Sequence, residues 1–136
     1  MFLFVSIKSN YYIFYFRLVL AQGCFLSTYL ITGSNRGIGL ELVRQLKDRG
    51  EDVIATCRST SAELNALSVR VETGVDITSG DSVLKLRENL NDTKVDVLIQ
   101  NAGIAEFNSL NNLDPQSIVH QFEVNALSPL CCVQTM

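Results

Sequence analysis

The sequence predicts an α/β fold in which helices cover both faces of a doubly wound parallel sheet. From residue 28 onward, short β-branched segments alternate with amphipathic helical segments, and a glycine-rich turn follows the first of them. Val95–Ile99 is the near-continuous apolar segment that is typical of a strand buried on both faces. Strands separated by helices of this length imply right-handed crossovers and parallel pairing.

The first predicted unit is a strand, a glycine turn and a helix. Thr28–Thr32 is short, β-branched and apolar, and it leads directly into the glycines of residues 33–39. The helix that follows repeats apolar residues at four-residue spacing and ends near Gly50, where a C-cap glycine belongs. Its predicted apolar face consists of Ile38, Leu42 and Leu46.

The pattern then repeats along the chain. Val53–Cys57 is predicted as the second strand, Ser61–Leu67 as a short helix and Val69–Val75 as the third strand. Ser79–Leu90 is predicted as another helix, and Val95–Ile99 as the fourth strand. The apolar face of that helix consists of Val83, Leu86 and Leu90.

A last helix is predicted to begin at Asp114 and Pro115. Asp is a preferred N-cap, and Pro is favoured at the first helical position. An amide falls on the apolar face of this helix, which consists of Ile118, Phe122, Asn125 and Pro129. A buried amide must find hydrogen-bond partners or cost about 1–3 kcal/mol, so Asn125 is either a satisfied core residue or part of a site.

The composition allows one globular domain. The chain has 136 residues, 47% of them hydrophobic, and a formal net charge of −3. This apolar content can form a core, and the low hydrophobicity and high net charge of disordered chains are absent from the composition. A weak negative charge with no run of Lys or Arg argues against nucleic acid as a partner.

Residues 1–27 differ from residues 28–136 and are interpreted as an apolar leader. Lys8 and Arg17 are its only charges, and they interrupt the run of about 20 apolar residues that a membrane-spanning helix needs. A membrane partner is therefore not favoured. A secretory signal, an organelle transit peptide, a membrane anchor and an artefact of the gene model remain open for this segment. Residues 28–136 form the predicted partial domain.

The glycine turn is the first feature that indicates chemistry. A glycine-rich turn between a strand and a helix lets the backbone approach a pyrophosphate, and the helix N-terminus favours an anion. The spacing Gly33-x-x-x-Gly37-x-Gly39 differs from the G-x-G-x-x-G of most dinucleotide folds. Taken alone, these glycines could equally form an ordinary tight turn.

Four segments in order resemble the short-chain dehydrogenase/reductase family. Thr32–Gly39 is similar to the family's cofactor turn, and Gln100–Gly103 to its Asn-Ala-Gly signature. Val75–Thr78 and Val124–Ala126 match two further family positions. The resemblance implies a Rossmann-like domain, here the N-terminal, cofactor-binding half of an oxidoreductase. The Asn-Arg-Gly within the turn resembles the carbonyl-reductase-like branch.

The resemblance assigns cofactor contacts to three segments of the sequence. It implies that Asp76 bonds the adenine amino group and that Ile77 lines the same pocket, although an Asp after a strand is also a plausible turn residue or N-cap. It places the small residues Asn101, Ala102 and Gly103 beside the nicotinamide ribose. The turn itself contributes Gly33, Ser34, Asn35, Arg36, Gly37, Ile38 and Gly39.

The charges at the end of the second strand predict NADP(H) as the cofactor. An acidic residue at this place would bind the ribose hydroxyls of NAD, but here Cys57 and Arg58 occupy it and Asp52 lies at the strand's other end. Arg58 and Arg36 offer guanidinium groups suited to the 2′-phosphate. The alternative is that both arginines are solvated surface charges.

The resemblance implies hydride transfer to or from a carbonyl or alcohol substrate, with a Tyr, a Lys four residues later and a Ser as catalytic groups. It gives Asn125 a supporting catalytic role through a water. None of the four tyrosines here has Lys at the fourth following position, so we expect the chain as given to be inactive. The expected strand order is 3-2-1-4, which leaves Val95–Ile99 as an open apolar edge.

Other functions are less consistent with the sequence. A non-catalytic module that binds NADP(H) or a partner remains the alternative. His120 is the single histidine, and the four cysteines lack the spacing of a zinc site. Free thiols and an NADP(H) site favour the cytoplasm, with a plastid, a mitochondrion or a membrane surface as alternatives if the leader is genuine. The sequence does not assign a substrate or an oligomeric state.

Overall fold

A computed structural model describes residues 4–7, 26–107 and 109–136, and every structural statement below concerns these residues. Most of the leader, including Cys24, lies outside the described residues, as does its interpretation as a targeting or membrane segment. In the described part, no helix has the length and apolar content that crossing a membrane requires.

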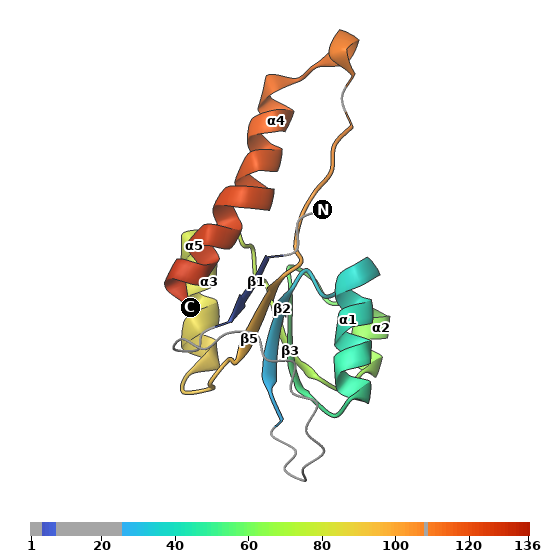
Figure 1. The fold of residues 1–136 in the computed structure, drawn as a ribbon, viewed down its shortest axis with the longest axis vertical. Helices are drawn as coiled ribbons and strands as arrows, with labels where there is room; N and C mark the ends of the chain where they lie inside the picture. Colours follow the sequence, from blue (N-terminus) through green and yellow to red (C-terminus); the bar gives the residue numbers. More distant parts are fainter. Residues whose placement is uncertain (1–3, 8–25, 108) are drawn as a thin grey trace, which may run out of the picture.

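The fold is a five-stranded sheet with helices on both faces (Figure 1). Its order is β1-β5-β2-β3-β4. The strands are β1 (Phe4–Ile7), β2 (Thr28–Thr32), β3 (Asp52–Cys57), β4 (Arg70–Thr73) and β5 (Val97–Gln100).

The parallel part of the sheet confirms the expected order. β2 pairs in parallel with β3 on one side and with β5 on the other, and β3 pairs in parallel with β4. Numbered from β2, these four strands lie in the order 3-2-1-4. The doubly wound α/β class predicted from the alternation of segments is therefore confirmed.

The expectation of an open edge at β5 is wrong. β1 lies along β5 and pairs with it antiparallel over four residues, from Phe4 opposite Gln100 to Ile7 opposite Val97. The sheet is therefore mixed, with one antiparallel edge strand on four parallel strands. The pattern missed this strand because it lies in the segment that was interpreted as a leader.

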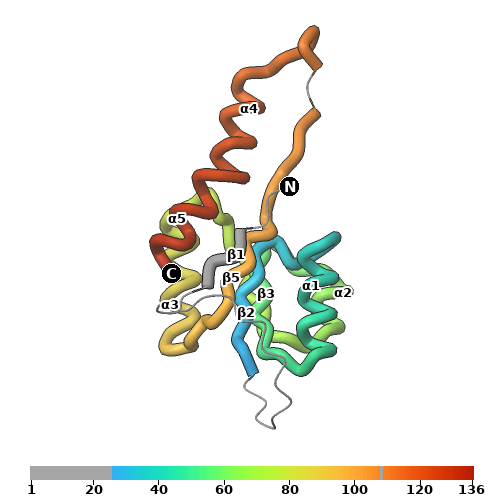
Figure 2. Tube along the Cα trace, in the orientation of Figure 1, coloured from blue at the N-terminus to red at the C-terminus, as the bar shows by residue number. Residues whose placement is uncertain are grey.

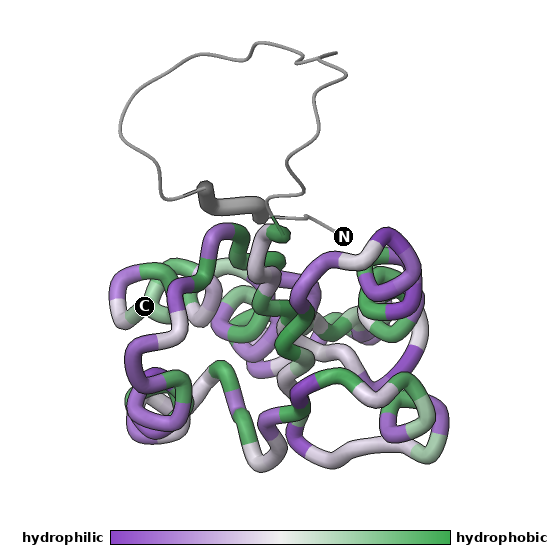
Figure 3. The backbone as a smooth tube through the Cα atoms, turned by 90° about the horizontal axis from the view of Figure 1, so that it is seen from below, coloured by the Kyte–Doolittle hydropathy of each residue, from purple (hydrophilic) through white to green (hydrophobic). Residues whose placement is uncertain are grey.

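Helices cover both faces of the sheet (Figure 1). α1 (Gly37–Asp48) and α2 (Ala62–Ala66) lie on the first face, where Ile31 and Ala55 pack with Val43 and Leu64. α3 (Gly80–Leu90) and α5 (Ser128–Thr135) lie on the second face. Its core contains Leu30, Ile54, Leu86, Leu90 and Leu98. Hydrophobic segments accordingly gather along the central strands in Figure 3.

The helix ends follow the sequence signals closely. The side chains of Ser61, Ser79 and Asp114 cap α2, α3 and α4 (Pro115–Phe122) by accepting a bond from a backbone N–H of the first turn. α1 ends in a Schellman motif, in which Gly50 N–H donates to Lys47 O (2.8 Å) and Glu51 N–H donates to Leu46 O (3.0 Å). Gly50 has a φ of +82°, which explains why glycine is favoured there.

The apolar face predicted for the last helix is only partly correct. Ile118 and Phe122 are exposed, whereas Ser117 and Pro129 are buried and Asn125 is half-buried. A π-helical turn, η2 (Glu123–Leu127), lies between α4 and α5 and shifts the register only of the side chains that follow it, such as Pro129. Ile118 and Phe122 precede this turn, in the part of the helix that lies away from the sheet (Figure 1). The face predicted for α1 is also only partly correct, because Ile38 is exposed while Val43 and Leu46 are buried.

The helix α4 and the segment that precedes it form an arm that rises from the sheet (Figure 2). We use the name arm for residues 104–107 and 109–123, which include the short helix η1 (Leu110–Asn112). The arm exposes several large apolar side chains: Phe107, Leu110, Leu113, Ile118, Val119 and Phe122.

The core on the second face predicts the effect of truncating a helix residue. Leu86 is 1% exposed and Leu84, on the same helix, is 50% exposed. Leu86→Ala should lower the free energy of unfolding by about 2–5 kcal/mol, because it leaves a cavity under the sheet. Leu84→Ala is the matched control and should change it by less than about 0.5 kcal/mol. Urea denaturation of the two variants measures both values; equal losses would contradict this core.

Candidate cofactor site

The predicted site residues gather at one edge of the sheet. The carboxyl ends of β2, β3 and β5 lead into the glycine turn, Arg58 and Asn101, and the segment after β4 contributes Asp76. In open α/β sheets, ligands bind at the carboxyl ends of the strands. The binding position lies between two neighbouring strands whose following connections run to opposite faces of the sheet. β2 and β5 are such a pair, because α1 follows β2 on one face and the last helix follows β5 toward the other.

The glycine turn is packed too tightly for other residues at two positions. A Cβ on Gly33 would lie 2.8 Å from the Ala102 Cα atom, and Gly33 has a φ of +68°. A Cβ on Gly39 would lie 2.2 Å from the Gly33 carbonyl oxygen and 2.5 Å from Asn101 Nδ2. Gly37 has a φ of +57° and open space around it. The turn therefore lies directly against the segment that follows β5.

The first turn of α1 is suited to an anion. Arg36 is its N-cap, with extended backbone, and its side chain makes no capping bond. α2, α3 and α4 each begin with a side-chain cap, so α1 differs from these three helices. The N–H groups of its first turn and the positive end of the helix dipole can thus bind a phosphate.

Ser34 and Asn35 have different surroundings within the turn. Ser34 is fully buried, and its hydroxyl donates to Ile31 O (2.7 Å) while its backbone N–H donates to Thr56 O (3.1 Å). Ser34 therefore fixes the turn to two strands, and its hydroxyl does not face the ligand side. Asn35 is half-buried, and Ile38 at the start of α1 is exposed.

Thr32 and Asn101 join the glycine turn to the segment after β5. The buried Thr32 hydroxyl accepts from the backbone N–H groups of Asn101 and Ala102, both at 3.1 Å, and donates to Gln100 Oε1 at 3.4 Å. Asn101 Nδ2 donates to the carbonyl oxygens of Thr32 and Gly33, both at 3.0 Å. The sequence prediction assigned Thr32 no role; a buried hydroxyl at the last position of a strand was the available signal.

Asp76 forms a local turn at the same edge. Its Oδ1 accepts from the Thr78 backbone N–H (2.9 Å) and hydroxyl (2.7 Å), and its own N–H donates to Ser82 Oγ (2.9 Å). The bonds from Thr78 lower the pKa of Asp76 below its ordinary value, and the positive charge of Arg58 lowers it further. The carboxylate is therefore ionised near neutral pH. Ile77 is buried beside it.

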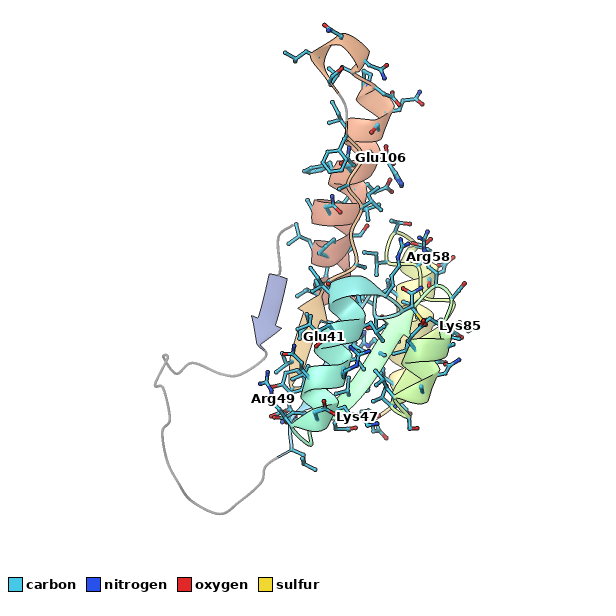
Figure 4. The ribbon with its side chains drawn as sticks, turned by 90° about the vertical axis from the view of Figure 1, so that its right-hand side faces the viewer. Glu41, Lys47, Arg49, Arg58, Lys85 and Glu106 are labelled. Carbon is cyan, nitrogen blue, oxygen red and sulfur yellow. The ribbon has the colours of Figure 1, made fainter. Side chains whose placement is uncertain are left out.

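The two arginines predicted to bind a phosphate are exposed. Arg58 lies at the end of the sheet from which the arm rises, whereas Lys47 and Arg49 lie at the opposite end (Figure 4). Cys57, which precedes Arg58, is buried, and burial raises the pKa of its thiol. Asp52 lies at the other end of β3, where its carboxylate accepts from the Thr28 hydroxyl at 3.4 Å.

Asn125 holds the base of the arm. Its Oδ1 accepts from the Ile104 N–H (2.9 Å) and its Nδ2 donates to Ile104 O (2.7 Å), so both ends of the amide are bonded. A Cβ on Gly103 would lie 3.0 Å from this Oδ1 atom. The π turn at residues 123–127 contains Asn125, so its amide meets the segment that carries Ala102 and Gly103. In this structure Asn125 is a half-buried amide whose hydrogen bonds to Ile104 satisfy both of its ends.

Other reactive groups do not gather into a second site among the residues described. His120 is about half exposed, with its Nδ1 atom 3.9 Å from a Glu123 carboxylate oxygen. Cys57 and Cys132 are buried thiols, and Cys131 is exposed. Over residues 26–107 and 109–136, no cluster of three His, Cys, Asp or Glu side chains could hold a metal ion.

Residues 27–136 match the family model for short chain dehydrogenases. A 1-hydroxy-2-glutathionyl-2-methyl-3-butene dehydrogenase from Rhodococcus is 40% identical over 113 residues, which cover 82% of this chain and 50% of that protein. An L-xylulose reductase from Caenorhabditis elegans is 31% identical over 77% of this chain and 44% of its own length.

Solved structures agree in fold. A short-chain dehydrogenase/reductase from Burkholderia multivorans with bound NADP superposes with a TM-score of 0.74 at 30% identity, covering 81% of this chain and 52% of that one. A carbonyl reductase from Pseudomonas aeruginosa gives a TM-score of 0.72 at 30% identity, covering 81% of this chain and 55% of its own. The chain thus spans about half the length of the relatives that it matches.

The packing at Gly39 predicts a specific sensitivity of the turn. Gly39→Ala should lower the free energy of unfolding by about 2 kcal/mol or more, because the new Cβ would meet backbone and amide atoms at 2.2 and 2.5 Å. The matched control is Gly80→Ala, where nothing lies within 4 Å; it should be neutral or stabilising by about 0.4–1 kcal/mol. Thermal and urea denaturation test both, and an unaffected Gly39→Ala protein would refute the tight turn.

Proposed function

Because the chain belongs to the short-chain dehydrogenase family, we propose that it binds NADP(H) at the carboxyl edge of its sheet as the cofactor half of an oxidoreductase. The observation that carries this proposal is the pairing of an uncapped helix N-terminus after a tight glycine turn with Arg58 at the end of β3. Both features favour phosphate groups.

The proposed fit divides the cofactor among three groups of residues. The backbone of residues 33–39 would hold the pyrophosphate, and Asp76 with Ile77 would border the adenine. Asn101, Ala102 and Gly103 would border the nicotinamide ribose, where the small side chains leave room. When bound, the nicotinamide supplies a hydride donor or acceptor.

The choice of NADP(H) over NAD(H) rests on charge. Arg58 follows β3 where an NAD-binding protein of this fold would carry an acidic residue, and Arg36 lies in the glycine turn as the N-cap of α1. Both side chains are exposed and can turn toward a 2′-phosphate, for which the planar guanidinium is well suited. The bound NADP in the Burkholderia relative supports this choice.

For a full-length form we propose reduction of a carbonyl or oxidation of an alcohol, as in carbonyl reductases. In these 136 residues no Tyr is followed at the fourth position by Lys, so we propose that this chain binds cofactor without turnover. The same observation favours the second candidate, a non-catalytic module that binds NADP(H) or a partner. We place it in the cytoplasm; a plastid, a mitochondrion or a membrane surface remain the alternatives if residues 1–27 act as a leader.

Substitution of Arg58 tests the cofactor choice. Arg58→Ala should weaken NADPH binding about 10- to 100-fold, because a hydrogen bond to a charged group contributes about 1.5–3 kcal/mol, and should leave NADH binding unchanged. Arg49→Ala, at the opposite end of the sheet, is the matched control and should affect neither cofactor (Figure 4). Isothermal titration calorimetry of the unmodified chain and the two variants measures the six dissociation constants. Equal losses for NADPH and NADH would contradict recognition of the 2′-phosphate by Arg58.

A turnover assay tests the missing chemistry. The purified 136-residue chain is mixed with NADPH and a panel of aldehydes and ketones. We expect no carbonyl-dependent decrease of the NADPH absorbance, because no Tyr with a Lys at the fourth following position is present to transfer the proton. Bound NADPH in the same sample, detected by its fluorescence, shows that the site is intact. Steady oxidation that scales with protein concentration would overturn the prediction.

A further inference from the structure

The helix of the arm packs with its polar side inward. Ser117 is buried and Gln121 is half-buried, whereas three large apolar residues of the same helix are exposed: Ile118, Val119 and Phe122. A polar side chain that leaves water costs free energy unless it finds hydrogen-bond partners. The orientation of α4 is therefore best explained by the groups that its polar side binds.

Those groups belong to the segment that leads from β5 into the arm, which runs as an extended chain in Figure 2. The Glu106 N–H donates to Gln121 Oε1 at 3.0 Å, and the Ile104 N–H donates to Asn125 Oδ1 at 2.9 Å. Alternate residues of an extended chain point their N–H groups the same way and lie about 6.7 Å apart. Residues four positions apart on a helix lie about 6 Å apart along its axis. Two amide side chains of the helix can therefore bind two alternate N–H groups of the segment.

Glu106, Ser117 and Gln121 form a closed ring of three hydrogen bonds. The Ser117 hydroxyl donates to the Glu106 carboxylate at 2.5 Å, and Gln121 Nε2 donates to the Ser117 hydroxyl oxygen at 3.3 Å. The third bond is the one from the Glu106 N–H to Gln121 Oε1, so each residue both donates and accepts. We call these three residues the latch. Because the bonds of such a ring strengthen one another, removing one residue weakens the whole latch.

The latch adjoins the part of the site that is proposed to border the nicotinamide ribose. The Ala102 N–H donates to the Thr32 hydroxyl, and the Ile104 N–H donates to the Asn125 side chain. Gly103 therefore lies between two fixed points, one in the sheet and one at the base of the arm. The latch supports the second point, because it holds the next part of the segment against α4. Without the latch, the second point depends more strongly on the bonds of Asn125.

We propose that Glu106, Ser117 and Gln121 are positioning residues for the nicotinamide end of the cofactor, acting through Gly103. This role rests on the cofactor site proposed above. In that site the phosphates are assigned to the glycine turn and to Arg58, where other hydrogen bonds hold the backbone. A ligand binds less tightly when the segment that it contacts is ordered in only a fraction of the molecules. Opening the latch therefore weakens binding of the nicotinamide end and leaves binding of the phosphate end unchanged.

Two ligands separate the two ends of the site. NADPH reaches both ends, whereas adenosine 2′,5′-bisphosphate has the adenine and the 2′-phosphate but no nicotinamide. Gln121→Ala and Glu106→Ala should each weaken NADPH binding about 3- to 10-fold, the loss expected when one or two hydrogen bonds no longer order the segment. Both variants should bind the bisphosphate as tightly as the unmodified chain does. Calorimetric titration with each ligand measures these affinities.

Two further variants are the controls. Glu106→Gln keeps a carbonyl oxygen that can accept from the Ser117 hydroxyl, so this variant should retain most of the affinity for NADPH. Gln116 is exposed on the same helix, and Gln116→Ala should affect neither ligand. Hydrogen exchange adds a measurement without ligand. The Ile104 amide, which Gln121 does not bind directly, should exchange about 3- to 10-fold faster in Gln121→Ala, with the Ala102 amide unchanged.

The outcomes separate the role of the latch from the cofactor site itself. A loss confined to NADPH, together with retained affinity in Glu106→Gln, would support the latch. Equal losses for the two ligands, NADPH binding unchanged in both alanine variants, or unchanged exchange at Ile104 would overturn the latch and leave the proposed cofactor site in place. An unmodified chain that binds neither ligand would overturn the proposed function, and the role of the latch with it.

Discussion

The contact between the glycine turn and the segment after β5 is the constraint on which the rest of the site depends. The Thr32 hydroxyl accepts hydrogen bonds from two backbone N–H groups of that segment. The Asn101 side-chain amide donates hydrogen bonds to the carbonyl oxygens of Thr32 and Gly33. Gly39 has no side chain because these atoms already fill the space. Two strands separated by about 70 residues in the chain are thereby held in one register at their carboxyl ends, which places the N-terminus of α1 beside the sheet.

The sequence predicted the elements well because their signals are local. Ser61, Ser79, Asp114 and Gly50 mark helix ends through bonds to residues within a turn, and each end lies where these residues predict it. The register of the last helix could not be predicted in this way. Ile118 and Phe122 are exposed because α4 lies away from the sheet (Figure 1), and the π turn that follows α4 has no simple sequence signal. β1 was missed for a similar reason, because its pairing with β5 is entirely non-local.

The structure brings the predicted site residues together, and their roles in binding stay a prediction. The motif residues gather at one edge of the sheet, but several of their side chains are used by the fold itself. The Ser34 hydroxyl and both ends of the Asn125 amide bond to backbone, and Asp76 closes a turn with Thr78. A sequence motif identifies the residues of a candidate site. The contacts in the structure are needed to distinguish side chains that hydrogen-bond to the backbone from side chains that are available to bind a ligand. Arg36 and Arg58, both exposed, belong to the second kind.

The arm and the glycine turn are stabilised by different interactions. The glycine turn is fixed by buried hydrogen bonds within the sheet. The arm is held at its base by the hydrogen bond between Asn125 and Ile104. Within the arm, the Glu106 carboxylate accepts from the Ser117 hydroxyl and the Glu106 N–H donates to Gln121 Oε1. Its large apolar side chains, including Phe107 and Leu110, are exposed and add little packing energy. Segments with few buried contacts open at lower free energy than the core. The arm can therefore open locally while the hydrogen bonds of Thr32 and Asn101 keep the glycine turn in place. Local opening of the arm then need not disturb the glycine turn.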